Sequence, residues 1–94
     1  MIVRILGEGQ WRMDDAARAE LNVLDDAVEA AVRAGDQAAL GTALNNLHDK
    51  VREVGQVVSD EELADSDLIL PDVDSSVAEV QALLNGTAEG LIPN

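Results

Sequence analysis

The sequence contains no cysteine, phenylalanine or tyrosine, and it has one tryptophan and two prolines in 94 residues. Without cysteine the chain can form neither a disulfide framework nor a thiolate metal site, which suits a cytoplasmic protein. No apolar run approaches the roughly 18 to 20 residues of a membrane span. The N-terminus also lacks the pattern of a secretory signal. We therefore expect a cytoplasmic protein with an aliphatic core, in which Trp11 is the one large aromatic anchor.

Basic residues are also scarce, since six Lys and Arg stand against 19 Asp and Glu and give a net charge of −13. All six basic residues fall within residues 1–54, whereas residues 55–94 carry nine acidic residues and no basic one. This balance disfavours direct binding to nucleic acid or to an anionic membrane, and it favours a basic protein partner. An adaptation to solubility, especially at high salt, is an equally good interpretation of the same charge.

The N-terminal residues predict a β-hairpin. Residues 2–6 are rich in β-branched side chains, Gly7-Glu8-Gly9 forms a three-residue loop, and residues 10–13 return. In this register Arg4 lies directly opposite Arg12, so the two arginines need carboxylates from the chain or from a partner. The Gly-x-Gly pattern does not indicate a phosphate loop, because a carboxylate occupies it and no helix follows directly. The apolar face of the hairpin then consists of Val3, Ile5, Trp11 and Met13.

Apolar residues at intervals of three and four predict two helices, from Asp14 or Asp15 to Ala34 and from about Gln37 to Val54. Gly35 ends the first helix and Asp36 caps the second, so the two form an antiparallel helical hairpin. One apolar stripe of such a hairpin can be shared with a partner helix. The predicted core positions are Ala17, Leu21, Leu24, Val28, Ala31 or Val32, Leu40, Leu44, Leu47, Val51 and Val54, while Gly41 and Ala43 permit close approach of a neighbour.

Residues 56–67 are polar and acidic, with Ser59 and Glu62 spaced to cap one helical turn. Residues 68–70 predict a short, largely buried strand that stops at proline. A last helix then begins with the capping box of residues 76 and 79, buries Val77, Val80, Leu83 and Leu84, and ends at Asn85-Gly86. The apolar tail, residues 91–93, is expected to dock on the core. The resulting fold class is α+β: one small two-layer domain over residues 1–94, in the order strand, strand, helix, helix, strand, helix.

No residue pattern in the chain predicts catalysis, metal binding or a cofactor. His48 is the only histidine, no Ser–His or Cys–His pair can be assembled around it, and we expect it to face solvent or a partner. The acidic residues between 60 and 67 lack the spacing and central glycine of a calcium loop. Asp14-Asp15 and Asp25-Asp26 are interpreted as a helix start and a solvated helix face. The sequence therefore predicts a protein that is not an enzyme.

Several segments of this sequence resemble the PspA-associated protein family, PspAA. The resemblance rests on "MIVRILGEGQWRMDD", "ELNVLDDAVEAAV", "LHDKVREVG", "DEELADSDLILP" and "GLIP", and it runs nearly end to end. It implies a non-enzymatic partner of PspA, the membrane-associated, helix-rich protein of the phage-shock envelope-stress response. The family provides no established catalytic residues that could be carried over to this chain.

The residues and the resemblance together predict a protein–protein interaction with a PspA-like coiled coil, reaching the inner face of the membrane only through PspA. The candidate docking surface combines the helical hairpin with seven charged residues, namely Asp60, Glu61, Glu62, Asp65, Asp67, Arg4 and Arg12. A different interpretation is a self-associating structural or ligand-sensing domain, a homodimer that does not bind PspA.

Overall fold

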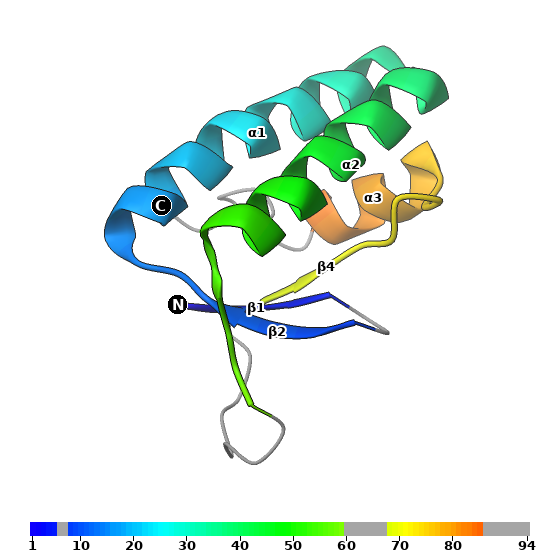
Figure 1. Ribbon diagram of the computed structural model, residues 1–94. Coiled ribbons are helices and arrows are strands. Elements are labelled where there is room, and N and C mark those ends of the chain that lie inside the picture. The colour runs from blue at the N-terminus through cyan, green and yellow to red at the C-terminus, as the bar shows by residue number, and fades with distance from the viewer. Residues whose placement is uncertain (6–7, 60–67, 86–94) are drawn as a thin grey trace.

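The computed structural model describes residues 1–5, 8–59 and 68–85, and it contains four strands and three helices in that part of the chain (Figure 1). The expected α+β fold is confirmed, with a short additional strand after the second helix. The elements are β1 (Ile2–Ile5), β2 (Gly9–Arg12), α1 (Asp15–Ala34), α2 (Gln37–Val54), β3 (Gln56–Val57), β4 (Leu68–Leu70) and α3 (Val77–Asn85).

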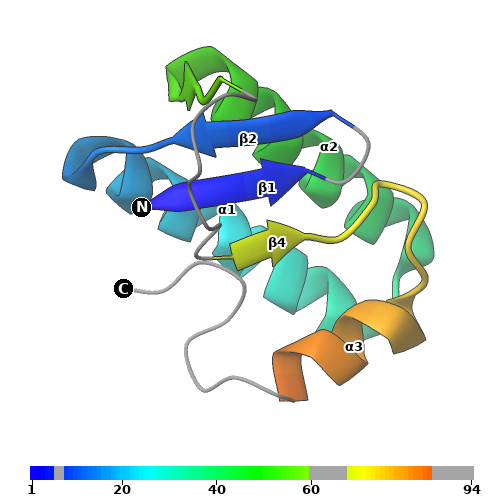
Figure 2. The same ribbon diagram turned by 90° about the horizontal axis from the view of Figure 1, so that it is seen from below.

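The strands form one mixed sheet in the order β3-β2-β1-β4. β1 pairs antiparallel with β2 and parallel with β4, and β2 pairs antiparallel with β3. Helices α1 and α2 run antiparallel and cover one face of this sheet, while α3 contacts α1 (Figures 1 and 2). One face of the helical hairpin therefore packs on the sheet, and the opposite face points away from the sheet.

The helix ends follow from local hydrogen bonds that the sequence predicts. Asp14 caps α1 by accepting from the Ala17 amide at 2.8 Å, and Asp36 caps α2 in the same way. Gly35 ends α1 with φ +66°, a left-handed conformation that glycine adopts without steric cost. The capping box of Ser76 and Glu79 is also present, with the Glu79 amide donating to the Ser76 hydroxyl at 3.1 Å.

The core lies between the sheet and the helical hairpin and is almost wholly aliphatic. Trp11 is 8% exposed and joins it from β2, as expected for the only aromatic residue. Of the predicted helix positions, Leu24 and Val54 are only partly buried, and Leu83 on α3 is 50% exposed, so its predicted burial is wrong. The fully buried large side chains are Val3, Ile5, Leu21, Val28, Leu40, Leu44, Leu47, Val51, Leu70 and Val80.

The register of the β-hairpin differs from the prediction. Ile5 lies opposite Gly9 and Val3 opposite Trp11, so the strands are displaced by two residues from the predicted pairing of Ile5 with Trp11. A displacement of two residues keeps every side chain on its face. The predicted inner face of the hairpin is therefore correct although the predicted partners are wrong: Val3, Ile5, Trp11 and Met13 are all buried.

Two further predictions concern the sheet. Gln56 and Val57 form the edge strand β3, where the sequence indicated only a polar segment. Leu70 is buried as predicted, but Ile69 is 52% exposed, because β4 is the opposite edge strand and this side chain faces away from the helices. Residues 60–62 of the predicted turn, and residues 91–93 with their predicted docking, lie outside the described residues.

Candidate interaction surface

The acidic connector, residues 60–67, holds five of the predicted docking residues and lies outside the described part of the chain. Those five residues are Asp60, Glu61, Glu62, Asp65 and Asp67. The elements on either side of it are described: β3 lies at one edge of the sheet and β4 at the other. The role of the five acidic residues in docking stays a prediction.

Arg4 and Arg12 are exposed on the face of the sheet that points away from the helices. Arg4 lies opposite Gln10 and Arg12 opposite Ile2, so the prediction that the two arginines face each other directly is wrong. They are diagonal neighbours on one face, because the strands are displaced by two residues. This geometry removes the direct like-charge pairing that the predicted register implied.

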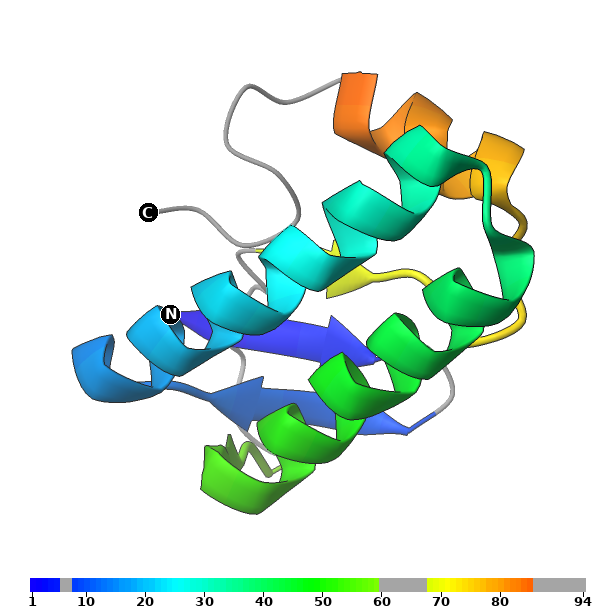
Figure 3. The same ribbon diagram turned by 90° about the horizontal axis from the view of Figure 1, so that it is seen from above.

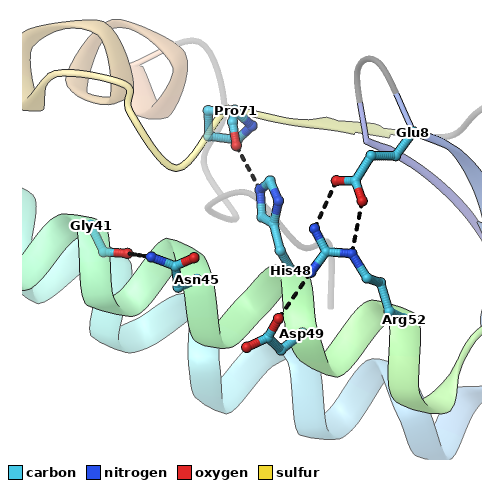
Figure 4. Close-up of polar contacts among 7 residues, drawn as sticks. All are labelled: Glu8, Gly41, Asn45, His48, Asp49, Arg52 and Pro71. Atoms are coloured by element: carbon cyan, nitrogen blue, oxygen red, sulfur yellow. Dashed lines mark hydrogen bonds and ion pairs between the residues drawn. The ribbon is translucent and has the colours of Figure 1, made fainter.

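Glu8, the carboxylate of the Gly-x-Gly segment, joins the tip of the hairpin to helix α2 (Figure 4). Its two oxygens accept from Nε and Nη2 of Arg52 at 2.9 and 2.7 Å, and Arg52 also donates from Nη1 to Asp49 at 2.9 Å. The hydrogen bond from Arg52 lowers the pKa of Glu8, opposed by the loss of solvent around the carboxylate and aided by the charge of Arg52. The same hydrogen bond raises the pKa of Arg52. This bidentate pair is exposed, so its main effect is to fix geometry.

His48 is buried, and the expectation that it faces solvent or a partner is wrong. Its ring Nε2 donates to the carbonyl oxygen of Pro71 at 2.7 Å, just beyond the end of β4 (Figure 4). His48 lies one turn from Leu44 and Val51, which place it on the buried side of α2. The imidazole therefore links α2 to the segment after β4 and is not available to an external substrate.

Asp25 is also buried, at 3% exposure, although the sequence indicated a solvated helix face for Asp25-Asp26. It follows Leu21 by one turn and precedes Val28 by three residues, so helix geometry places it on the buried side of α1. Asp26, one residue further, is exposed as expected. The charge of the two adjacent aspartates does not indicate that Asp25 lies on the buried face of α1 and Asp26 on the exposed face.

A groove of about 490 Å³ lies between α1 and α2 near the turn that joins them. Ala31 and Ala43 are buried there, whereas the remaining four alanines of the lining are exposed. Viewed from above, the two helices run side by side along this part of the molecule (Figure 3). The lining residues are Ala27, Ala30, Ala31, Ala34, Asp36, Ala39, Thr42, Ala43 and Asn46.

Charged side chains surround the rest of the helical hairpin. Lys50 of α2 lies 3.6 Å from Glu20 of α1 and 3.7 Å from Glu53. Arg33 lies 3.9 Å from Glu29 on α1. Three basic side chains of the hairpin, Arg33, Lys50 and Arg52, are thus already beside carboxylates of the same chain.

The alanine groove could have been found from the sequence, because alanine recurs on the helix positions that the leucine and valine stripes leave free.

A family model for PspA-associated protein matches residues 1–94. The chain belongs to the PspA-associated protein family. No curated protein and no solved structure matched the sequence. In this PspA-associated protein, no helix among the described residues is long and apolar enough to cross a membrane. The family name indicates association with PspA.

Proposed function

We propose that this chain is a non-enzymatic adaptor or regulator that binds PspA in the phage-shock, or envelope-stress, response. The observation that carries the proposal is the family match over residues 1–94, which we treat as one domain. In this proposal the protein acts in the cytoplasm and reaches the membrane only through PspA. Neither nucleic acid nor a cofactor takes part.

Electrostatic complementarity supports this proposal. A net charge of −13 favours a partner with basic stretches, and opposite potentials raise the rate of association as well as its specificity. We assign the docking surface to the acidic connector (Asp60, Glu61, Glu62, Asp65 and Asp67) and to the helical hairpin, with Arg4 and Arg12 as secondary contacts. The helical hairpin supplies a regular face against which a helix of PspA can pack.

Charge reversal of the connector tests this assignment. We expect a variant with Asp60, Glu61, Glu62 and Asp65 replaced by Lys to lose co-purification with PspA. The matched control compares two double variants with an equal change in net charge: Asp60 and Glu61 of the connector replaced by Lys, and Asp72 and Asp74, which are exposed and lie outside both the connector and the helical hairpin, replaced by Lys. Circular dichroism confirms that each variant is folded. Binding by the connector variant that equals wild-type binding at low salt would contradict docking through the connector.

A second candidate function is self-association, as a structural or ligand-sensing homodimer. The observation in its favour is a set of exposed large aliphatic side chains, which a second copy of the chain would have to bring into one contact surface. These are Val23, Val57, Ile69 and Leu83, each at least half exposed. Light scattering of the protein alone and with PspA separates the two functions. A stable dimer without affinity for PspA would overturn the adaptor and establish the homodimer.

A further inference from the structure

The alanine groove between α1 and α2 is an apolar hollow whose walls carry no large side chain. Six of its nine lining residues are alanine, and the other three are Asp36, Thr42 and Asn46. We propose that this groove receives one basic amphipathic helix of a protein partner. The inference rests on the proposed function, because it specifies where and through what kind of segment that partner binds.

The shape of the groove fits a helix. Its walls are two antiparallel helices, and from Ala27 to Ala34 the α1 wall extends about 10 Å, or two helical turns. Helix axes pack about 8 to 10 Å apart depending on the side chains at the contact, and alanine walls permit the shorter distance. Large aliphatic side chains at positions i, i+3 or i+4, and i+7 of the incoming helix would enter the space that the alanines leave.

The charge of the hairpin decides between a basic partner and a second copy of this chain. Residues 14–54 contain nine acidic and four basic residues, Asp36 lines the groove, and Asp26 is exposed beside Ala27. Arg33, Lys50 and Arg52 already have carboxylates of this chain within 4.0 Å. A second hairpin would bring the same negative excess against the first, whereas Lys and Arg flanking an apolar stripe would complement it.

Two tryptophan substitutions, one residue apart, test the assignment. Ala39 lines the groove, whereas Ala38 is also exposed and does not. Both lie in the first turn of α2, so the cost of placing tryptophan in a helix is similar at the two positions. We expect Ala39→Trp to weaken binding to full-length PspA by about tenfold or more, because its side chain occupies the groove, and Ala38→Trp to stay within about twofold of wild type. Ala30→Trp, on the opposite wall, should reproduce the loss.

The controls separate this inference from the proposed function. Unfolding midpoints show whether each variant is folded, and Ala30→Trp serves if Ala39→Trp does not fold. Equal binding of PspA by Ala39→Trp, Ala38→Trp and wild type would overturn the groove while leaving PspA binding intact. Failure of the wild-type chain to bind PspA would overturn both. A wild-type dimer that Ala39→Trp dissociates and Ala38→Trp does not would assign the groove to a second copy and also overturn the inference.

Discussion

Gly55 follows the last residue of α2, and its backbone is held close to both the helix and the hairpin. A Cβ at this position would lie 2.5 Å from Met13 Cε, 2.6 Å from the Val51 carbonyl oxygen and 2.8 Å from Trp11 Cβ. Its φ of −79° is open to any residue, so glycine is required here by space. We expect Gly55→Ala to lower the free energy of unfolding by about 1 to 3 kcal/mol, as overpacked cores do. Urea unfolding followed by Trp11 emission, which should be blue-shifted in the buried native state, measures the change.

Gly41 provides the matched control, because it lies inside α2 where a Cβ meets only the Val73 carbonyl oxygen at 3.9 Å. Glycine in a helix interior is less stable than alanine by roughly 0.5 to 1 kcal/mol. We therefore expect Gly41→Ala to stabilise the protein by about that amount. A Gly55→Ala variant as stable as wild type would contradict the packing described around Gly55, and a loss of stability in Gly41→Ala would contradict the open space described around Gly41.

We expect His48 to stabilise the folded protein, because its ring donates a hydrogen bond to a buried carbonyl oxygen between α2 and β4. Pro71 is buried, and its oxygen accepts from Nε2 of His48 at 2.7 Å. His48→Phe keeps an aromatic ring and removes the donor, and an unsatisfied buried acceptor costs about 1 to 3 kcal/mol. Denaturant unfolding of this variant should show that loss. His48→Gln, whose amide can donate, should lose less, and equal stability of all three proteins would refute the role of this hydrogen bond.

At the scale of elements, the Glu8–Arg52 pair connects the hairpin to α2 and makes that connection sensitive to acid. The pKa of Glu8 is lowered in the folded state, so its contribution to stability is complete above the unfolded pKa of the carboxyl. The contribution is lost as the pH falls through the lower, folded pKa. We expect Glu8→Gln to reduce the fall in stability between neutral pH and acid, with a small effect because the pair is exposed.

Unfolding curves of wild type and Glu8→Gln over this pH range measure the difference. Glu53→Gln is the control, since it removes a longer carboxylate contact with Lys50 on the same helix. Parallel pH profiles for wild type and Glu8→Gln would show that the pair does not contribute.

The helices could be predicted closely from the sequence because their signals are local. Asp14, Gly35 and Asp36 act within one turn of the chain, and the apolar periodicity needs no knowledge of distant contacts. The hairpin partners could not be predicted, because a displacement by two residues leaves the inner face unchanged. The two-residue strand β3 shows no alternation, and it is defined by its pairing with β2.

Predictions of exposure failed where burial depends on a distant segment. His48 lies at the edge of the apolar stripe of α2. That edge is buried only because Pro71, 23 residues later in the chain, packs against it. Gln37 shows the same limit: its side chain donates to the Ser75 carbonyl and accepts from the Val77 amide, both at 2.9 Å. No local pattern indicates a glutamine that links the start of α2 to the start of α3.

At the scale of the whole molecule, two surfaces differ in character. The sheet face opposite the helices carries Arg4 and Arg12, whereas the outer face of the helical hairpin combines an alanine groove with an excess of acidic residues. The family match and the charge both favour a protein partner, and our proposal assigns it to the second surface. The central claim is that this partner is PspA and that charge complementarity contributes to its binding.

A calorimetric titration of the full chain into full-length PspA, at two salt concentrations, tests this claim most directly. Exposed charges interact over about 30 Å at 0.01 M salt and over about 8 Å at 0.15 M. We predict saturable binding at the lower concentration that becomes weaker at the higher one. Absence of binding at low salt would contradict the assignment of PspA as the partner, and binding independent of salt would contradict the contribution of charge.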